Sequence, residues 1–384
     1  MNRVLALVNM TGLIVGVSYG LHGPILPIFA KNVIGATYTE LGLIGFANFI
    51  PYMFIPLFVG ALLDRFSNAR LLAVGAAVNA VSVYLLSVAH TVPEITAFRI
   101  MTGVAHAFFW PPCESIIANE SRGRDRVRNI SWFTMFFVIG FMTGPLLGAV
   151  FLEETDSAYR LLFQVAAFML AAGIVTALLG SGGRAGMRRE RFSIRSIAEM
   201  KKFPEVIVLL VFCTSSFGII LTIYPAFLND RGMTAVDILL LYFVFGIART
   251  VTLVFAGRLA ARTGHTLIAA TAAISAGLAI SVVADSIMSF AAALILMGFG
   301  FSIFFPLTLE IILSRTKRAI SGKMIGAYET VFGVGWAVGP TIGGPITMLG
   351  DTVPYAVFCI AGVGVTALAI LSRKRLEPQG SHYV

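Results

Sequence analysis

The sequence predicts an all-α membrane protein in which twelve transmembrane helices form two pseudo-symmetric six-helix bundles. Hydrophobic residues make up 58% of the 384 residues, and charged residues make up only 12%. A chain of this composition needs lipid as the solvent for most of its length. The apolar sequence also divides into twelve stretches, and the first six resemble the last six. These observations together favour a duplicated, helical membrane protein.

Each apolar stretch is close to the ~20 residues that a helix needs to cross ~30 Å of hydrocarbon. The first stretch is longer than the core of a signal peptide, so we interpret it as a membrane span. The expected spans are residues 4–30, 39–63, 71–90, 94–117, 130–152, 158–180, 204–228, 235–257, 265–284, 287–313, 322–348 and 353–372.

The two halves of the chain share glycines and prolines at a nearly constant offset. Gly20 and Pro27 recur as Gly218 and Pro225, at an offset of 198 residues. Later pairs recur at an offset of 195, and they are Gly103/Gly298, Pro111/Pro306, Gly140/Gly335, Gly144/Gly339, Pro145/Pro340 and Gly148/Gly343. An offset that drifts by only three residues is typical of an internal duplication.

A basic segment separates the two halves. Residues 181–202 contain seven Lys and Arg and two Glu, which is incompatible with a position in lipid. We therefore expect an N-terminal bundle over 1–180, a cytoplasmic linker over 181–203, and a C-terminal bundle with a short tail over 204–384.

The positive charges also predict the orientation. The linker, both chain ends and the loops on the same side of the predicted spans hold 23 of the 28 Lys and Arg. Because basic loops stay in the cytoplasm, we expect a multi-pass protein of the cell membrane with both termini cytoplasmic.

The end of the second span reads Gly60-Ala-Leu-Leu-Asp64-Arg65-Phe. With the repeat and the basic linker, this motif resembles the loop between spans two and three of the major facilitator superfamily. The resemblance implies the major facilitator fold, and it implies that Asp64 and Arg65 help to hold the two halves shut on the cytoplasmic side. The family usually continues with a glycine and a basic pair, whereas here Ser67-Asn68-Ala69 precede Arg70. The alternative for Asp64 is a solvated loop aspartate.

Spans four and five carry two further motifs. Arg99 to Gly103 is similar to the family's arginine-to-glycine motif, and the fifth span resembles its antiporter motif through Gly140, Gly144, Pro145 and Gly148. The resemblance is closest to the twelve-span drug:proton antiporter branch. The glycines share one helix face and allow another helix to approach, while Pro145 frees a backbone carbonyl. Helix packing alone is the alternative to an antiporter role.

Charged residues inside spans are candidates for transport chemistry, because a charge at the bilayer centre costs about 2.5–3.5 kcal/mol. Arg99 and Arg249 need a carboxylate, backbone carbonyls or an anionic substrate. Glu114 and Glu310 lie near the cytoplasmic ends of spans four and ten, where we expect salt bridges to loop arginines and a gating role. Glu329 lies deeper in span eleven. It is the candidate proton carrier, and a permanently protonated glutamate is the alternative.

The first span has no acidic residue but contains His22 beside Gly23-Pro24. Histidine has an unperturbed pKa near ~6.5, which suits proton exchange, although His22 could equally cap the backbone freed by Pro24. The cavity or substrate site is expected to include His22, Arg99 and Arg249, together with His106, Trp110, Tyr224, Tyr328, Phe332 and Trp336.

These features favour a proton-coupled exporter of amphipathic small molecules that works by alternating access. The alternative is a carrier of a small anionic metabolite such as a carboxylate, which Arg99 and Arg249 would favour. A non-transporting receptor is disfavoured because all loops are short. The sequence has no catalytic cluster, metal-ligand spacing or nucleotide-binding loop, so we expect no enzyme activity, cofactor or metal. The expected partners are a small molecule, protons and lipid, with no nucleic acid and a monomeric state.

Overall fold

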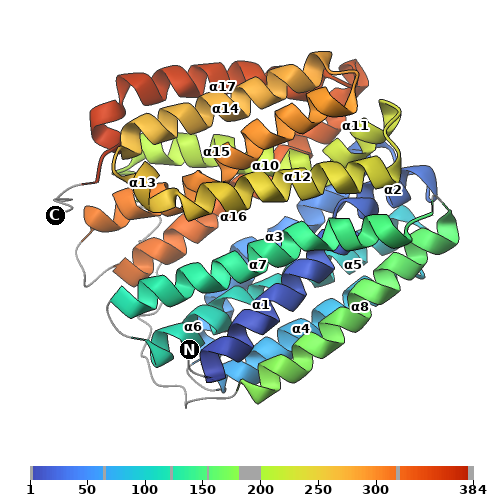
Figure 1. Cartoon of the computed structure of the whole chain (residues 1–384), viewed down its shortest axis with the longest axis horizontal. Helices are drawn as coiled ribbons and strands as arrows, with labels where there is room; N and C mark the ends of the chain where they lie inside the picture. The colour runs from blue at the N-terminus through green and yellow to red at the C-terminus, as the bar shows by residue number, and fades with distance from the viewer. Residues whose placement is uncertain are drawn as a thin grey trace.

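The structure, a computed structural model, describes residues 3–63, 66–121, 124–153, 155–180, 200–316 and 321–378. Every regular element in these ranges is a helix. The helices form two bundles that lie side by side, one coloured blue to green and the other yellow to red (Figure 1). This arrangement confirms the predicted fold class of twelve transmembrane helices in two six-helix bundles.

The N-terminal bundle contains two spans that are broken into consecutive helices. The first break lies at Gly23 and Pro24, because proline lacks the N–H that would continue the helix. The second lies at Phe108 and Phe109, ahead of two more prolines. The helices are α1 (Arg3–His22), α2 (Ile25–Asn32), α3 (Tyr38–Leu63), α4 (Asn68–Leu86), α5 (Val92–Ala107), α6 (Trp110–Glu120), α7 (Arg124–Phe151) and α8 (Asp156–Leu179).

The C-terminal bundle shares the first of these two breaks, while its fourth span is one continuous helix. Its first span is also broken, near Ile223, where Pro225 follows. Its helices are α10 (Pro204–Thr222), α11 (Tyr224–Asp230), α12 (Ala235–Val254), α13 (Ala256–Ala260), α14 (Thr263–Val283), α15 (Ile287–Ser314), α16 (Ser321–Ile346) and α17 (Val353–Leu371), with short 3₁₀ turns η2 (Thr347–Leu349) and η3 (Arg373–Leu376).

Within the described ranges, nine segments are long and apolar enough to cross a membrane, with α1 and α2 counted as one. The other predicted spans are α3, α16, and α5 with α6, where the break leaves two helices of 16 and 11 residues. The chain is thus a multi-pass membrane protein.

One end of the molecule, here called the linker end, holds the start of α1, the end of α8, the start of α10 and the end of α17 (Figure 1). The opposite end, called the far end, holds α2 and α11. The first and the last helical elements, α1 and η3, both lie at the linker end (Figure 1), as expected for an even number of spans. Residues 181–199 lie outside the described residues, so the boundaries 1–180, 181–203 and 204–384 stay a prediction, as does the membrane side that each end faces.

Four helices form the interface between the bundles: α3 packs against α16, and α7 packs against α12. Inside the bundles, α7 packs against α1 and α16 packs against α10. The helices that carry the repeated glycine–proline motif, α7 and α16, therefore each contact both bundles. This position places the motif next to any site at the interface.

Candidate functional site at the bundle interface

The motif on α7 packs directly onto α1. A Cβ atom on Gly140 would lie 2.2 Å from the Leu13 carbonyl oxygen, and one on Gly144 would lie 2.4 Å from the Val17 carbonyl oxygen. Real side chains cannot approach backbone this closely, so glycine is needed at both positions. Gly148 is less tightly packed. The close packing that we considered as the alternative for this motif is therefore present.

Pro145 adds a second feature to this contact. Proline leaves the carbonyl of Phe141 without its helical N–H partner. A Cβ on Gly20 of α1 would lie 2.4 Å from that carbonyl oxygen and 2.7 Å from Pro145 Cδ. The glycine thus lets α1 cover the freed carbonyl with a Cα–H contact. The packing also holds the Phe141 side chain at the bundle interface.

The C-terminal bundle repeats this contact. A Cβ on Gly218 of α10 would lie 2.6 Å from the carbonyl oxygen of Trp336, which Pro340 leaves without its helical partner, and 2.9 Å from Pro340 Cδ. Phe141 and Trp336 are therefore equivalent residues of the two repeats. Both of their side chains lie in the candidate site at the bundle interface.

The first part of the site is a polar cluster inside the N-terminal bundle, formed by Tyr19, His22, Arg99 and His106. The Tyr19 ring lies 5.1 Å from the His22 ring and 4.6 Å from the His106 ring, and it lies beside the Arg99 guanidinium. Arg99 is only 6% exposed. Its Nε and Nη1 atoms are buried and have no hydrogen-bond partner among the described residues. The structure thus brings together three predicted site residues, with Tyr19 at their centre.

His22 is fully buried in this cluster. Its Nδ1 atom lies 2.6 Å from the Ser18 carbonyl oxygen, while Nε2 has no partner among the described residues. The ring is therefore held by its own helix on one side and directs its second nitrogen into the cluster. The ring therefore contacts the Ser18 carbonyl of its own helix, and a role of His22 in proton exchange stays a prediction.

The second part of the site surrounds Arg249 on α12. The guanidinium carbon lies over the rings of Phe141, Phe217 and Phe245 at 5.5, 5.2 and 5.6 Å. Arginine over aromatic faces gains about 0.5–2 kcal/mol for each favourable contact, and more where water is absent. The rings partly replace water around the charge, and Arg249 Nε has no hydrogen-bond partner in the described part of the chain. Because Phe141 belongs to the other bundle, this contact crosses the interface.

The third part of the site centres on Trp336 of α16. Its ring stacks on Phe217 at 5.7 Å and contacts Phe332 and Phe49, each at 4.9 Å. Phe49 lies on α3, so this cluster also spans both bundles. The Trp336 Nε1 atom is buried without a partner among the described residues. A buried indole N–H of this kind is free to donate to a ligand.

Glu329 lies two turns from Trp336 on the same helix. Its Oε2 atom accepts a hydrogen bond of 3.1 Å from the hydroxyl of Tyr52 on α3. Glu114 on α6 lies close enough to interact electrostatically with Glu329. The structure therefore places two predicted carboxylates from opposite bundles within electrostatic range of each other. Two intramembrane carboxyl groups near each other form a suitable place for an exchangeable proton.

These three parts form one continuous line of side chains. Tyr19 contacts Phe141 at 6.4 Å, Phe141 contacts Arg249, and Phe217 joins Arg249 to Trp336. Trp336 then contacts Tyr52 at 6.1 Å, and Tyr52 bonds Glu329. We call this line the interface pathway. It connects both arginines that were predicted as site residues with the carboxyl pair.

Several predicted residues lie elsewhere. Tyr224 is fully buried in the C-terminal bundle, where it bonds Ser281 at 2.7 Å and packs on Tyr355. Tyr328 is likewise buried, and its hydroxyl lies 2.9 Å from that of Thr308. Neither side chain reaches the interface pathway directly, although Tyr328 contacts Phe332 at 6.1 Å.

Trp110 packs in the N-terminal bundle between Phe109, Phe133 and Phe137 at 5.1–5.4 Å. Its placement is that of a packing residue beside the site.

The predicted gating residues are only partly described. Glu310 is exposed at the linker end. Arg315, a loop arginine next to the same helix end, donates to the carbonyl oxygens of Arg375 and Glu377 at 2.8 and 2.7 Å. Asp64 and Arg65 lie outside the described residues. The gating roles of these residues and of Glu114 stay predictions.

Sequence reasoning overlooked Tyr19, Phe49, Tyr52, Phe141 and Phe217. One signal was available for Phe141. It lies 195 residues before Trp336, and each of the two precedes the motif proline by four residues. The other four aromatic residues have no such relation to a repeated motif. The sequence does not show which face of an apolar helix contacts the other bundle.

Comparison with known proteins identifies the family of this chain. The family model of the Major Facilitator Superfamily matches residues 8–340 and, in a second match, residues 266–382. The chain belongs to the major facilitator superfamily. As a member of this superfamily it is a transporter of small molecules and not an enzyme.

Among curated proteins, this superfamily member is similar to two resistance proteins. Quinolone resistance protein NorA of Staphylococcus aureus (strain MRSA252) is 25% identical over 171 residues, which are 44% of each chain. Multidrug resistance protein 1 of Bacillus subtilis (strain 168) is 25% identical over 224 residues, which are 57% of each chain. The matched region thus spans about half the length of these relatives.

Among solved structures, the superfamily fold is shared across almost the whole chain. The nucleoside transporter NupG has a TM-score of 0.78 at 12% identity and covers 98% of this chain and 100% of its own. The human organic anion transporter MFSD10 has a TM-score of 0.68 at 14% identity and covers 97% and 99%. At these identities the likeness concerns the fold alone.

Proposed function

We propose that this transporter is a proton-coupled exporter of amphipathic, drug-like small molecules. The observation that carries the proposal is the interface pathway, where a wall of aromatic rings from both bundles adjoins the carboxyl pair of Glu114 and Glu329. Aromatic rings bind flat apolar molecules with little directional demand, and the unpartnered Trp336 N–H offers one polar anchor. The names of the two resistance-protein relatives point in the same direction.

The hydrogen bond of Glu329 links proton binding to the relative position of the two bundles. Its donor, Tyr52, belongs to the other bundle, so the bond changes whenever the bundles move relative to each other. A carboxyl group whose partner depends on the conformation can take up a proton in one state and release it in the other. The substrate at Trp336 and the proton at Glu329 then compete for the same end of the interface pathway.

The second candidate function is transport of a small anion. It is favoured by the buried nitrogen atoms of Arg99 and Arg249 that have no hydrogen-bond partner among the described residues. Guanidinium groups in such surroundings bind carboxylates well. The three phenyl rings around Arg249 weaken this case, because they already stabilise its charge.

Glu329→Gln and Arg249→Gln separate the two functions. Glutamine mimics the protonated acid but cannot release a proton, so Glu329→Gln should abolish proton-driven transport and retain ligand binding. In an anion carrier, Arg249→Gln should abolish binding, while Arg249→Lys should retain part of it as a point charge. Binding and proton-driven flux are measured for all three variants in liposomes, first with lipophilic cations and then with small carboxylates.

A proton-coupled exporter requires that binding of a lipophilic cation survives in Glu329→Gln while uphill flux is lost. Loss of carboxylate binding in Arg249→Gln, with normal flux in Glu329→Gln, would overturn the exporter and establish the anion carrier.

A further inference from the structure

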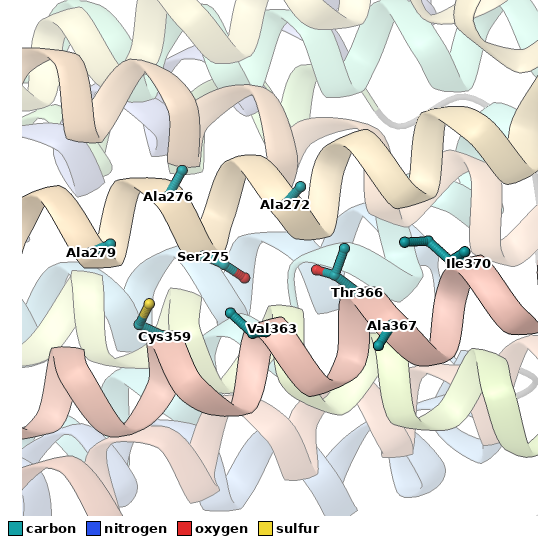
Figure 2. Close-up of a pocket in the computed structure, with 9 residues that line it drawn as sticks. All are labelled: Ala272, Ser275, Ala276, Ala279, Cys359, Val363, Thr366, Ala367 and Ile370. Carbon is teal, nitrogen blue, oxygen red and sulfur yellow. The ribbon is translucent and has the colours of Figure 1, made fainter.

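A groove runs along the lipid-facing side of the C-terminal bundle, between α14 and α17. Figure 2 shows its walls, with Ala272, Ala276 and Ala279 on one helix and Cys359, Val363 and Ala367 on the other. The cavity measures about 420 Å³, within the ~300–1,000 Å³ of ordinary ligand sites. It lies away from the interface pathway and has no part in the proposed function.

The groove is apolar in its chemistry even where hydroxyl groups line it. Ser275 donates to the Thr271 carbonyl at 2.8 Å, and Thr366 donates to the Gly362 carbonyl at 2.7 Å. Both hydroxyl donors are therefore used within their own helices. The alanines opposite leave space that longer side chains would fill, so the groove suits a hydrocarbon chain.

A second cavity of about 440 Å³ adjoins the groove at the linker end. Ile370 lines both cavities, so they lie next to each other. The second cavity is strongly basic, because it is lined by Arg373, Lys374 and Arg375 of η3 and by His265 in the first turn of α14. A basic cavity thus opens at the end of an apolar groove.

The charges around the basic cavity are not balanced locally. Arg375 is paired with Glu205 at 2.7 Å. Arg373 Nη1 instead lies 3.1 Å from His265 Nε2, which is not a carboxylate. Among the described residues, neither Arg373 nor Lys374 forms a salt bridge. Glu377, the nearby carboxylate, accepts the Gly264 N–H at 3.0 Å.

We propose that the groove and the basic cavity together bind one anionic glycerophospholipid. Its phosphate lies at Arg373 and Lys374, and one acyl chain lies in the groove between α14 and α17. The anionic head group is assigned by charge complementarity, because basic pockets between membrane helices attract anionic head groups. Each Lys or Arg near the surface strengthens such binding about fivefold. The apolar groove beside the basic cavity favours a lipid over a free phosphate ion, because only a lipid places a hydrocarbon chain next to its phosphate.

The test measures binding of phosphatidylglycerol and of phosphatidylcholine to the full chain by native mass spectrometry from detergent. We expect phosphatidylglycerol to be retained preferentially. The double variant Arg373→Gln/Lys374→Gln should weaken its binding about 25-fold, from about fivefold for each residue. The matched control is Arg3→Gln/Arg70→Gln, which removes two exposed charges from the linker end of the N-terminal bundle and should leave binding unchanged.

A second variant tests the groove. Ala276→Leu fills it and should reduce phosphatidylglycerol binding, whereas Ala171→Leu on the exposed face of α8 should not. Inorganic phosphate in excess should fail to displace the lipid. Full displacement by phosphate with no effect of Ala276→Leu would overturn the lipid assignment, and equal binding by Arg373→Gln/Lys374→Gln and the unaltered chain would overturn the head-group site.

The unaltered chain provides an independent measurement through Cys359. Cys113 and Cys213 are buried, while Cys359 is partly exposed in the groove. A membrane-soluble maleimide should label Cys359 more slowly in nanodiscs that contain phosphatidylglycerol than in phosphatidylcholine alone. The same labelling rate in both lipids would contradict occupation of the groove.

Discussion

At the scale of single residues, the site depends on aromatic side chains that belong to two bundles at once. Trp336 contacts Phe49 across the interface and Phe217 within its own bundle, and its indole N–H has no partner among the described residues. If the proposed function is correct, we expect this residue to contact the ligand and to respond to the relative position of the bundles. It is therefore the first residue to substitute in a test of binding.

We expect Trp336→Ala to weaken the binding of a planar, lipophilic ligand by roughly tenfold or more, because several aromatic contacts of about 0.5–1.5 kcal/mol are lost together. Trp336→Phe should retain most of the affinity. Isothermal titration of the ligand into the purified protein measures both effects. Trp132→Phe is the control, since Trp132 is 48% exposed on the outside of the bundle. If Trp132→Phe weakened binding and Trp336→Ala did not, the ligand site would lie elsewhere.

At the scale of helices, the glycine–proline motif forms the same helix–helix contact in each of the two bundles. In each repeat a proline frees one carbonyl, and a glycine on the neighbouring helix covers it. The same contact therefore sets the spacing of α1 and α7 and of α10 and α16. It also holds Phe141 and Trp336 at equivalent places on the interface pathway. Close packing of the helices therefore positions two residues of the candidate site.

We expect Gly20→Ala and Gly218→Ala each to destabilise the protein by about 1–3 kcal/mol, because the added methyl group would overlap a backbone oxygen. The matched control is Gly364→Ala on α17, where a Cβ meets nothing within 4 Å. There the change should be neutral or stabilise by up to about 1 kcal/mol, since alanine favours the helix. Thermal unfolding in detergent measures all three. Equal melting temperatures for the three variants would contradict the packing account.

At the scale of the whole molecule, the two bundles are joined at the far end. Asp230 of α11 pairs with Lys31 of α2 and accepts a hydrogen bond of 2.6 Å from Tyr38, while Asn32 bonds Asn229 at 2.7 Å. All of these contacts cross between the bundles. They hold the far end closed in this structure, so movement of the bundles toward the opposite state must break them.

We expect Asp230→Asn to shift the population toward a state with an open far end by about fivefold, because a partly exposed ion pair contributes up to about 1 kcal/mol. Distances between spin labels at Val88→Cys and Met288→Cys, in a Cys359→Ser background, measure this opening. Asp285→Asn is the control, since Asp285 contacts Arg231 within one bundle at 3.4 Å. Identical distance distributions in both variants would show that the Asp230 contacts do not hold the far end closed.

The sequence by itself determined the membrane class, the duplication and nearly every helix. These follow from hydropathy and from repeated glycines and prolines, which act locally on the backbone. It also identified Arg99, Arg249 and Glu329, because charges in spans are conspicuous. Only the tertiary structure decided which side chains share a site. Phe217 and Tyr224 are both aromatic residues of the same span, yet one reaches the interface and the other bonds Ser281 inside the bundle. Helices in lipid are apolar on all sides, so their periodicity does not reveal the face that meets the other bundle.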